Sequence, residues 1–169
     1  MEKKVRLVAI ASIAAIILAC GLLAIPQFIV PNNYPVLESI SGYQFFFKAV
    51  GEVYEKNSHI GHVSGLGIAS IVLMALALIS YVFAFKSSAF SMLGGLLNVA
   101  TSILFFAMEA SKKNVYGSFY SFVRVSFISY IIGALLLISG FASIIISFVS
   151  MKVEKKDLSS KKSYSYIKK

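Results

Sequence analysis

The side chains that could hold a metal ion lie close together in the first half of the chain. His59 and His62 follow Glu55, so on one continuous helix the three would share a face at i, i+4 and i+7. Two imidazoles and a carboxylate form a ligand set that zinc accepts. Gly61 stands between the histidines, however, and glycine disfavours a helix at that point. We therefore predict no metal site and expect both histidines to lie at the edge of a membrane.

Residues that could support catalysis are scattered along the chain. Serine, histidine and glutamate occur outside the apolar segments, but no spacing brings a nucleophile next to a base. The sequence has no glycine-rich phosphate loop and no paired carboxylates within an apolar segment. We predict that the chain is not an enzyme and that it uses no cofactor.

The single cysteine, Cys20, allows two interpretations. Lys3, Lys4, Arg6 and the apolar run up to Ala19 resemble the start of a bacterial lipoprotein with its lipobox, which implies cleavage before Cys20 and lipidation. The apolar run continues past the cysteine as GLLAI, whereas a signal peptide gives way to polar sequence. We predict an uncleaved helix with an inert cysteine, and lipidation remains the alternative.

Four apolar segments must position all of these side chains. Each has about the 20 residues that a helix needs to cross a bilayer, and 58% of the chain is hydrophobic. The expected spans are residues 5–25, 62–85, 88–108 and about 123–151. The sequence thus predicts an all-α integral membrane protein, with four transmembrane helices in a compact bundle over residues 1–151.

The charge distribution predicts the orientation of the bundle. The chain carries 16 basic and 7 acidic residues, a formal net charge of +9. Eleven of the basic residues lie at the N-terminal end of the first span (Lys3, Lys4 and Arg6), in the turn at Lys86 and in the tail 152–169. Cytoplasmic segments of membrane proteins are enriched in lysine and arginine, so we predict a multi-pass protein of the cell membrane with both termini cytoplasmic. Nucleic acid is then not needed to explain the charge.

The tail 152–169 is polar and basic, without apolar periodicity, and we predict that it is disordered. Its lysines are expected to attract anionic lipid at the inner leaflet.

Within the spans, small residues recur at the spacing that lets helices approach closely. They are Ala11, Ala15 and Ala19, then Gly61 and Gly65, then Gly94 and Gly95, then Ser139, Ser143 and Ser147. The pattern favours a compact bundle, and formation of a homo-oligomer is the alternative. Asn98 lies in the middle of the third span and is expected to need an internal hydrogen-bond partner.

Glu109 and Arg124 flank the short loop between the third and fourth spans, so a hairpin would place them at similar depth. We predict an ion pair between them that staples the two helices, with an ion or substrate gate as the alternative. The spans have no ionisable group near their centres. The small multidrug exporters, which also have four helices, depend on a membrane-embedded glutamate in the first helix, and this chain has none there.

The outer loop 26–61 contains an amphipathic segment, SISGYQFFFKAVGEVYEKN, at residues 39–57. At 100° per residue, its lysines and glutamates gather on one side and apolar side chains on the other, which predicts a helix. The apolar face consists of Tyr43, Phe46, Phe47, Val50, Val53 and Tyr54. Ser41 and Gln44 fit a capping box at its start. This face is expected to cover the bundle as a lid, to lie on the membrane surface or to receive a partner.

Four spans, two cytoplasmic termini and a larger first outer loop resemble the claudin-like tetraspans in layout. The tryptophan and the paired loop cysteines of those proteins are missing from this chain, so the resemblance implies no family. We predict a non-enzymatic accessory or assembly subunit that contacts the lipid bilayer and a membrane-protein partner or a second copy. A small oligomeric transporter or channel is the alternative.

Overall fold

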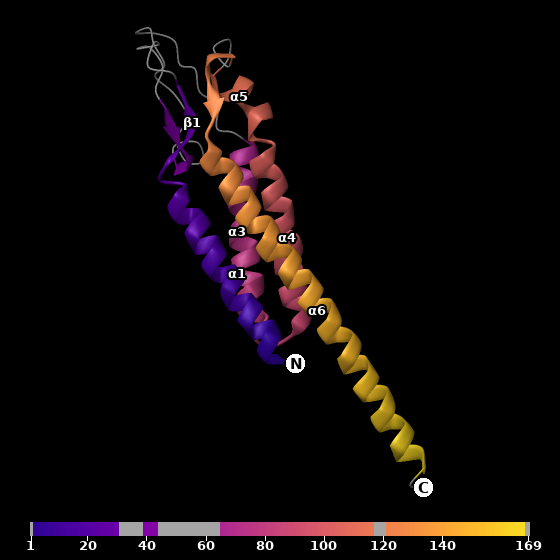
Figure 1. The fold of residues 1–169 in the computed structure, drawn as a ribbon. Helices are drawn as coiled ribbons and strands as arrows, with labels where there is room; N and C mark the ends of the chain where they lie inside the picture. The colour runs from indigo at the N-terminus through magenta and orange to yellow at the C-terminus, as the bar shows by residue number, and fades with distance from the viewer. Residues whose placement is uncertain (1, 31–38, 44–64, 117–120, 168–169) are drawn as a thin grey trace.

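The described part of the chain forms four long helices, one short helix and a small sheet (Figure 1). The sheet lies at the end of the bundle opposite the two termini, and we call this end the outer end. The computed structural model describes residues 2–30, 39–43, 65–116 and 121–167. The long helices are α1 (Glu2–Leu22), α3 (Gly65–Phe83), α4 (Ser88–Phe106) and α6 (Phe127–Ile167). The short elements are α5 (Met108–Tyr116), β1 (Pro26–Ile29), β2 (Ile40–Ser41) and β3 (Arg124–Val125).

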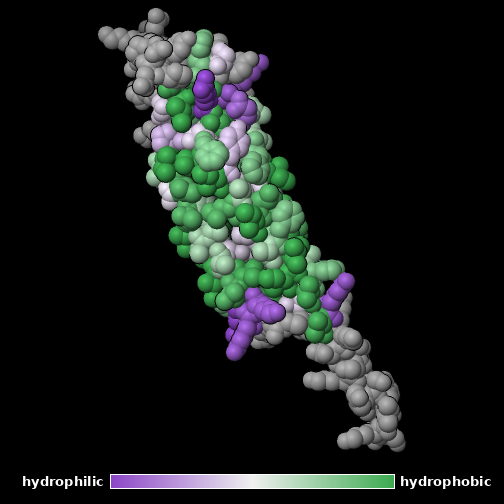
Figure 2. All heavy atoms as spheres, in the orientation of Figure 1, coloured by the Kyte–Doolittle hydropathy of each residue, from purple (hydrophilic) through white to green (hydrophobic). Residues whose placement is uncertain are grey.

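The four predicted helices are confirmed as helices that are long and apolar enough to cross a membrane. They run alternately up and down, so both termini lie at the end of the bundle where a tight turn joins α3 to α4 (Figure 1). Their 19 or more residues correspond to about 28 Å or more, which matches the hydrocarbon core of a bilayer. On the face shown in Figure 2, hydrophobic residues cover the middle of the molecule, and hydrophilic residues lie on both sides of this region.

Helix α4 packs against both α3 and α6, and α1 lies mainly along α6, so the contact between α4 and α6 is the most extensive one in the bundle. The helices approach closely where glycines meet. A Cβ atom built on Gly95 would lie 2.7 Å from the Gly140 carbonyl oxygen, and one built on Gly140 would lie 2.8 Å from that of Gly95. The α4 and α6 backbones are therefore in direct contact, as the small residues of both spans predict.

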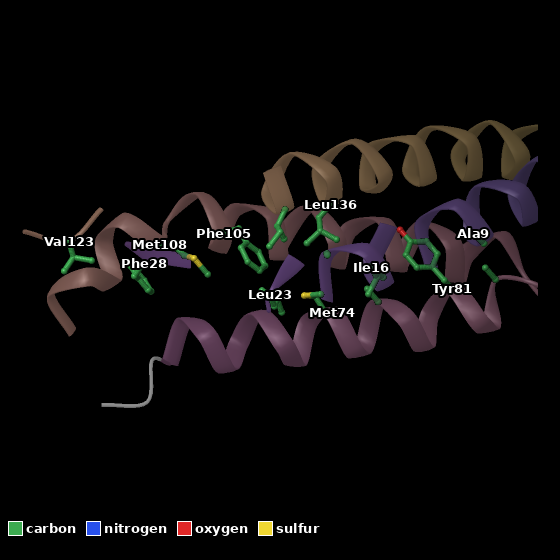
Figure 3. Packing of buried hydrophobic residues seen from close by; sticks show 14 of the residues in the cluster. Ala9, Ile16, Leu23, Phe28, Met74, Tyr81, Phe105, Met108, Val123 and Leu136 are labelled. Atoms are coloured by element: carbon green, nitrogen blue, oxygen red, sulfur yellow. The ribbon is translucent and has the colours of Figure 1, made fainter. Parts of the chain in front are cut away.

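Apolar side chains from every long helix fill the remaining interior (Figure 3). Ile16 and Leu23 come from α1 and the turn that ends it, Met74 from α3, Phe105 from α4 and Leu136 from α6. The outward faces of the same helices carry large exposed apolar side chains such as Leu7, Ile79, Ile103 and Ile138, which is the pattern of a surface in contact with lipid.

The outer end differs from the expected all-α architecture, because both outer connections contribute to a three-stranded antiparallel sheet of order β2-β1-β3. The sequence predicts only a turn where β1 begins, at Pro26. Proline is compatible with the first position of a strand, where its missing N–H costs little. The strand forms through pairing of Phe28 with Val125 and Ile29 with Arg124, nearly 100 residues away in sequence. Local patterning does not reveal such pairing.

Helix α6 also differs from expectation, because it does not end near Met151 but continues to Ile167, through the tail predicted as disordered. Its 41 residues correspond to about 60 Å, and its membrane-compatible part ends at Val153. After Gly140 the sequence contains neither glycine nor proline, so no residue interrupts the helix.

Candidate functional site

Polar side chains from all four long helices meet in the middle of the bundle, and we call this group the central polar cluster. Its members are Ser12 of α1, Tyr81 of α3, Asn98 of α4, and Ser139 and Ser143 of α6. All are buried except Ser139, which is half-buried. Figure 3 shows Tyr81 among apolar side chains, with its hydroxyl oxygen pointing away from α3.

Asn98 has the internal partners that its position predicts. Its Nδ2 group donates to the Tyr81 hydroxyl group at 3.2 Å and to Ser139 Oγ at 3.0 Å. Ser139 Oγ in turn donates to the Leu136 carbonyl oxygen. The asparagine therefore joins α4 to α3 and α6 by side-chain hydrogen bonds, which are favourable in an apolar surrounding where water does not compete.

Helix α1 joins the cluster through Ser12, whose Oγ lies 2.9 Å from Ser143 Oγ. Ser12 Oγ also lies 3.5 Å from the Ser139 carbonyl oxygen. Sequence reasoning missed Ser12 because it followed Ala11, Ala15 and Ala19, but Ala11 is exposed. The buried face of α1 instead carries Ala9, Ser12, Ala15, Ile16 and Ala19, and a search for polar residues on every possible face would have found it.

The other small residues divide between packed and open positions. Gly94 receives the Tyr81 ring, since a Cβ atom there would lie 2.9 Å from it, and Ser143 and Ser147 are fully buried. Gly65, at the start of α3, is open, because a Cβ atom there would have no heavy atom within 4 Å, so it does not serve as a contact. Gly61 lies outside the described residues.

A second polar group, which we call the outer clasp, consists of Gln27, Ser126 and Ser129 at the top of the bundle. The fully buried Gln27 side chain donates from Nε2 to the carbonyl oxygens of Leu22 (3.1 Å) and Ile25 (2.8 Å). Its Oε1 accepts from Ser129 Oγ at 2.8 Å, and its backbone oxygen accepts from the Ser126 N–H at 2.7 Å. One side chain thus caps the end of α1 and holds the beginning of α6.

Tyr43 is the one residue of the predicted apolar face that lies within the described part of the chain. Its hydroxyl group donates to the Cys20 carbonyl oxygen at 2.7 Å, and its N–H donates to the Leu23 carbonyl oxygen at 3.3 Å. Gly42 lies directly against Leu23, because a Cβ atom built there would be only 2.7 Å from Leu23 Cδ2. The amphipathic stretch therefore starts directly over the end of α1. Phe46, Phe47, Val50, Val53 and Tyr54 lie outside the described residues.

We expect Tyr43→Phe to lower the free energy of unfolding by about 1 kcal/mol, because it removes the bond to the Cys20 carbonyl oxygen and leaves that oxygen with the Leu23 N–H as its donor. Thermal unfolding in detergent would measure the change. Tyr130→Phe is the control, since Tyr130 stacks on Phe106 and its ring is retained. Equal melting temperatures for the two variants would contradict a positioning role of the Tyr43 hydroxyl group.

Glu109 and Arg124 lie on separate elements at the outer end. Glu109 is in the first turn of α5 and forms an ion pair with Lys112, one turn further along. Lys112 also donates to the Val123 carbonyl oxygen at 2.9 Å, so it connects α5 to the segment before β3. Arg124 is exposed in β3, opposite Ile29. The ion pair recorded for Glu109 is thus with Lys112, and a pair with Arg124 stays a prediction.

Cys20 is half-buried in α1, and the residues before it pack into the bundle. Cleavage at this point would remove Ser12 from the central polar cluster and Ile16 from the core, which supports the interpretation of an uncleaved helix. Glu55, His59 and His62 lie outside the described residues.

Comparisons of the chain with protein-family models, with curated proteins and with solved structures find no match. The function must therefore be inferred from the geometry of the chain itself.

Proposed function

We propose that this chain is a non-enzymatic protein of the cell membrane that acts through contacts with other proteins, as an accessory or assembly subunit. The observation that carries the proposal is the outer clasp, because it ties both outer connections and the ends of α1 and α6 into one unit. A sheet held in this way is a platform from which the segment after Tyr43 can be presented to a partner. The partner is a membrane protein or a second copy of the chain.

The polar groups of the bundle support a scaffold role. Between helices, Ser12 bonds to Ser143. Asn98 bonds to Tyr81 and to Ser139. Groups that hold helices together in this way stabilise one arrangement of the bundle. This is the property expected of a subunit that presents a surface.

The proposed orientation places both termini in the cytoplasm. Lys3, Lys4 and Arg6 belong to the beginning of α1, and Lys86 belongs to the turn between α3 and α4, which lies at the same end of the bundle (Figure 1). Lys152 stands where the membrane-compatible part of α6 ends. Lys86 Nζ lies 5.8 Å from the centre of the Phe83 ring, and Lys152 Nζ lies 4.6 Å from that of Phe148. Lysines at the boundary of the apolar band are typical of the cytoplasmic interface. We further propose that the basic residues of 152–169 attract anionic lipid there.

The test is co-purification of the full chain from its native membrane in mild detergent, with Phe46→Ser/Phe47→Ser compared with Phe45→Ser. The first two positions belong to the predicted apolar face, and Phe45 falls on the charged side, so it is a matched control. We expect recovery of the partner to fall by about tenfold or more in the double variant only, with its melting temperature unchanged. A monomeric chain that comes out alone, or a double variant that no longer folds, would contradict recognition and favour a lid.

A small oligomeric transporter or channel is the second candidate. It is favoured by four buried polar atoms of α4 and α6 that have no hydrogen-bond partner within the described part of the chain, namely Ser91 Oγ, Asn98 Oδ1, Ser102 Oγ and Ser147 Oγ. Solute flux into liposomes that contain the purified chain would support this candidate over the first.

A further inference from the structure

Buried hydroxyl groups in the long helices fall into two classes. Ser70, Ser80 and Thr101 donate to the carbonyl oxygen four residues earlier in their own helix, at 2.8–2.9 Å. This is the usual solution for serine and threonine in an apolar helix. Ser91, Ser102 and Ser147 are as deeply buried, but their Oγ atoms have no partner among the residues that the structure describes. These hydroxyl groups do not bond to their own helix backbones and need another partner.

The hydroxyl groups of the second class share one interface. At 100° per residue, Ser91, Gly95 and Ser102 point in nearly the same direction from the axis of α4. Gly95 contacts Gly140 of α6, so Ser91 and Ser102 also lie on the side of α4 that faces α6. Ser147 lies two turns from Gly140 on the matching side of α6. All of them are therefore in the contact between α4 and α6, where the bundle is packed most closely.

Asn98 adds an unmet acceptor to the same interface. Both Nδ2 hydrogens are used, by Tyr81 and Ser139, but nothing in the described residues donates to Oδ1. Turning the amide by 180° would exchange its two atoms and leave the Nδ2 hydrogens unpaired instead. The need for one more partner is thus independent of the amide orientation.

We propose that an ordered water molecule is bound between α4 and α6 and bridges Asn98 Oδ1 to Ser102 Oγ. The two residues are at i and i+4 on one helix face, where Cβ atoms are about 5–6 Å apart, so their polar atoms lie within the span of a single water. A water molecule can donate to the amide oxygen and accept from the hydroxyl group, and buried waters typically make about three hydrogen bonds of this kind. Without it, two polar atoms would remain unpaired in an apolar interior.

The glycine contact limits what can bind. At Gly95 and Gly140 the backbones leave no space for even one added carbon atom. This contact lies between Ser91 and Asn98 along α4, so it separates the Ser91 hydroxyl group from the site at Asn98. The ligand is therefore one small molecule that both donates and accepts hydrogen bonds. The glycine contact also interrupts any path for a solute along this interface. A water bound in this way is compatible with a role in contacts and with a role in transport.

Radiolytic footprinting with labelled water tests the proposal on the full chain in nanodiscs. After brief transfer into H₂¹⁸O, radicals formed at a slowly exchanging internal water still add ¹⁶O to neighbouring aromatic rings. We expect ¹⁶O-labelled products at Tyr81 and Phe105 in excess of those at Phe28, which is equally buried but lies in the outer sheet. The excess should fall several-fold in Ser102→Ala and remain in Ser70→Ala, whose hydroxyl group bonds within its helix.

Thermal unfolding gives a second readout on the same two variants. A bridging water predicts a lower melting temperature for Ser102→Ala, because Asn98 Oδ1 then loses its partner. Products at Tyr81 and Phe105 no higher than at Phe28, or a Ser102→Ala protein that melts at a higher temperature than the wild type, would overturn the proposal. The second result would show that the hydroxyl group is simply unpaired.

Discussion

Gly95→Ala is expected to lower the free energy of unfolding of the bundle by about 3 kcal/mol, a large effect for one methyl group. The added carbon would lie 2.7 Å from the Gly140 carbonyl oxygen and 2.9 Å from the Ile144 side chain. The carbonyl oxygen belongs to a packed helix and cannot rotate away, so α4 and α6 must separate. Separation also weakens the bond from Asn98 to Ser139. Unfolding in detergent or in a bilayer-mimetic disc would measure the loss.

Gly21→Ala is the matched control for this substitution. Gly21 is also a helical glycine, in α1, but a Cβ atom there would meet no heavy atom within 4 Å. Alanine favours a helix over glycine by up to about 1 kcal/mol, so this variant should be as stable as the wild type or slightly more so. If Gly95→Ala were tolerated as well as Gly21→Ala, the direct backbone contact between α4 and α6 would be wrong.

Gln27→Leu is expected to lower the free energy of unfolding by about 3 kcal/mol and to loosen the outer end first. Leucine has a similar volume, but it leaves the Ile25 carbonyl oxygen and the Ser129 hydroxyl group without their partner. The Leu22 carbonyl oxygen loses one of its two donors and keeps the Ile25 N–H. Each unpaired buried group costs about 1–3 kcal/mol, and partial access of water reduces the sum. Hydrogen exchange at the Ser126 amide, which donates to the Gln27 backbone oxygen, should become faster.

Ser39→Ala provides the comparison for the outer clasp. Ser39 is exposed and accepts from the Val30 N–H at 3.2 Å, a single bond at the margin of the same region. Its removal should cost about 1 kcal/mol or less and leave exchange at Ser126 unchanged. Equal effects of Ser39→Ala and Gln27→Leu would show that Gln27 does not hold the outer end together.

The central polar cluster was only partly predictable. Asn98 could be identified from its position, because an amide in the middle of an apolar span needs a partner wherever it lies. The identity of the partners depends on how the helices are rotated and staggered. Ser12 and Tyr81 therefore join the cluster only once α1 and α3 are placed against α4 and α6.

The outer clasp could not be predicted from local sequence. Gln27 stands in a segment whose prolines indicate a turn, and nothing near it signals a buried amide. Its partners are at the end of α1 and at the beginning of α6, about 100 residues later. In the tail after Met151, the polar composition predicted disorder, whereas α6 continues to Ile167. No glycine or proline follows Gly140 to interrupt this helix.

The amino-acid sequence by itself determined the four long helices and some of the close helix contacts, such as those at Gly94 and Gly95. In an apolar medium each backbone N–H and carbonyl group must be paired within its own segment, so length and apolarity are sufficient to define a helix. Tertiary structure alone decided the outer sheet, the role of Gln27 and the membership of the central polar cluster. These features consist of contacts between residues far apart in the chain, and their energy exists only after the helices have been packed together.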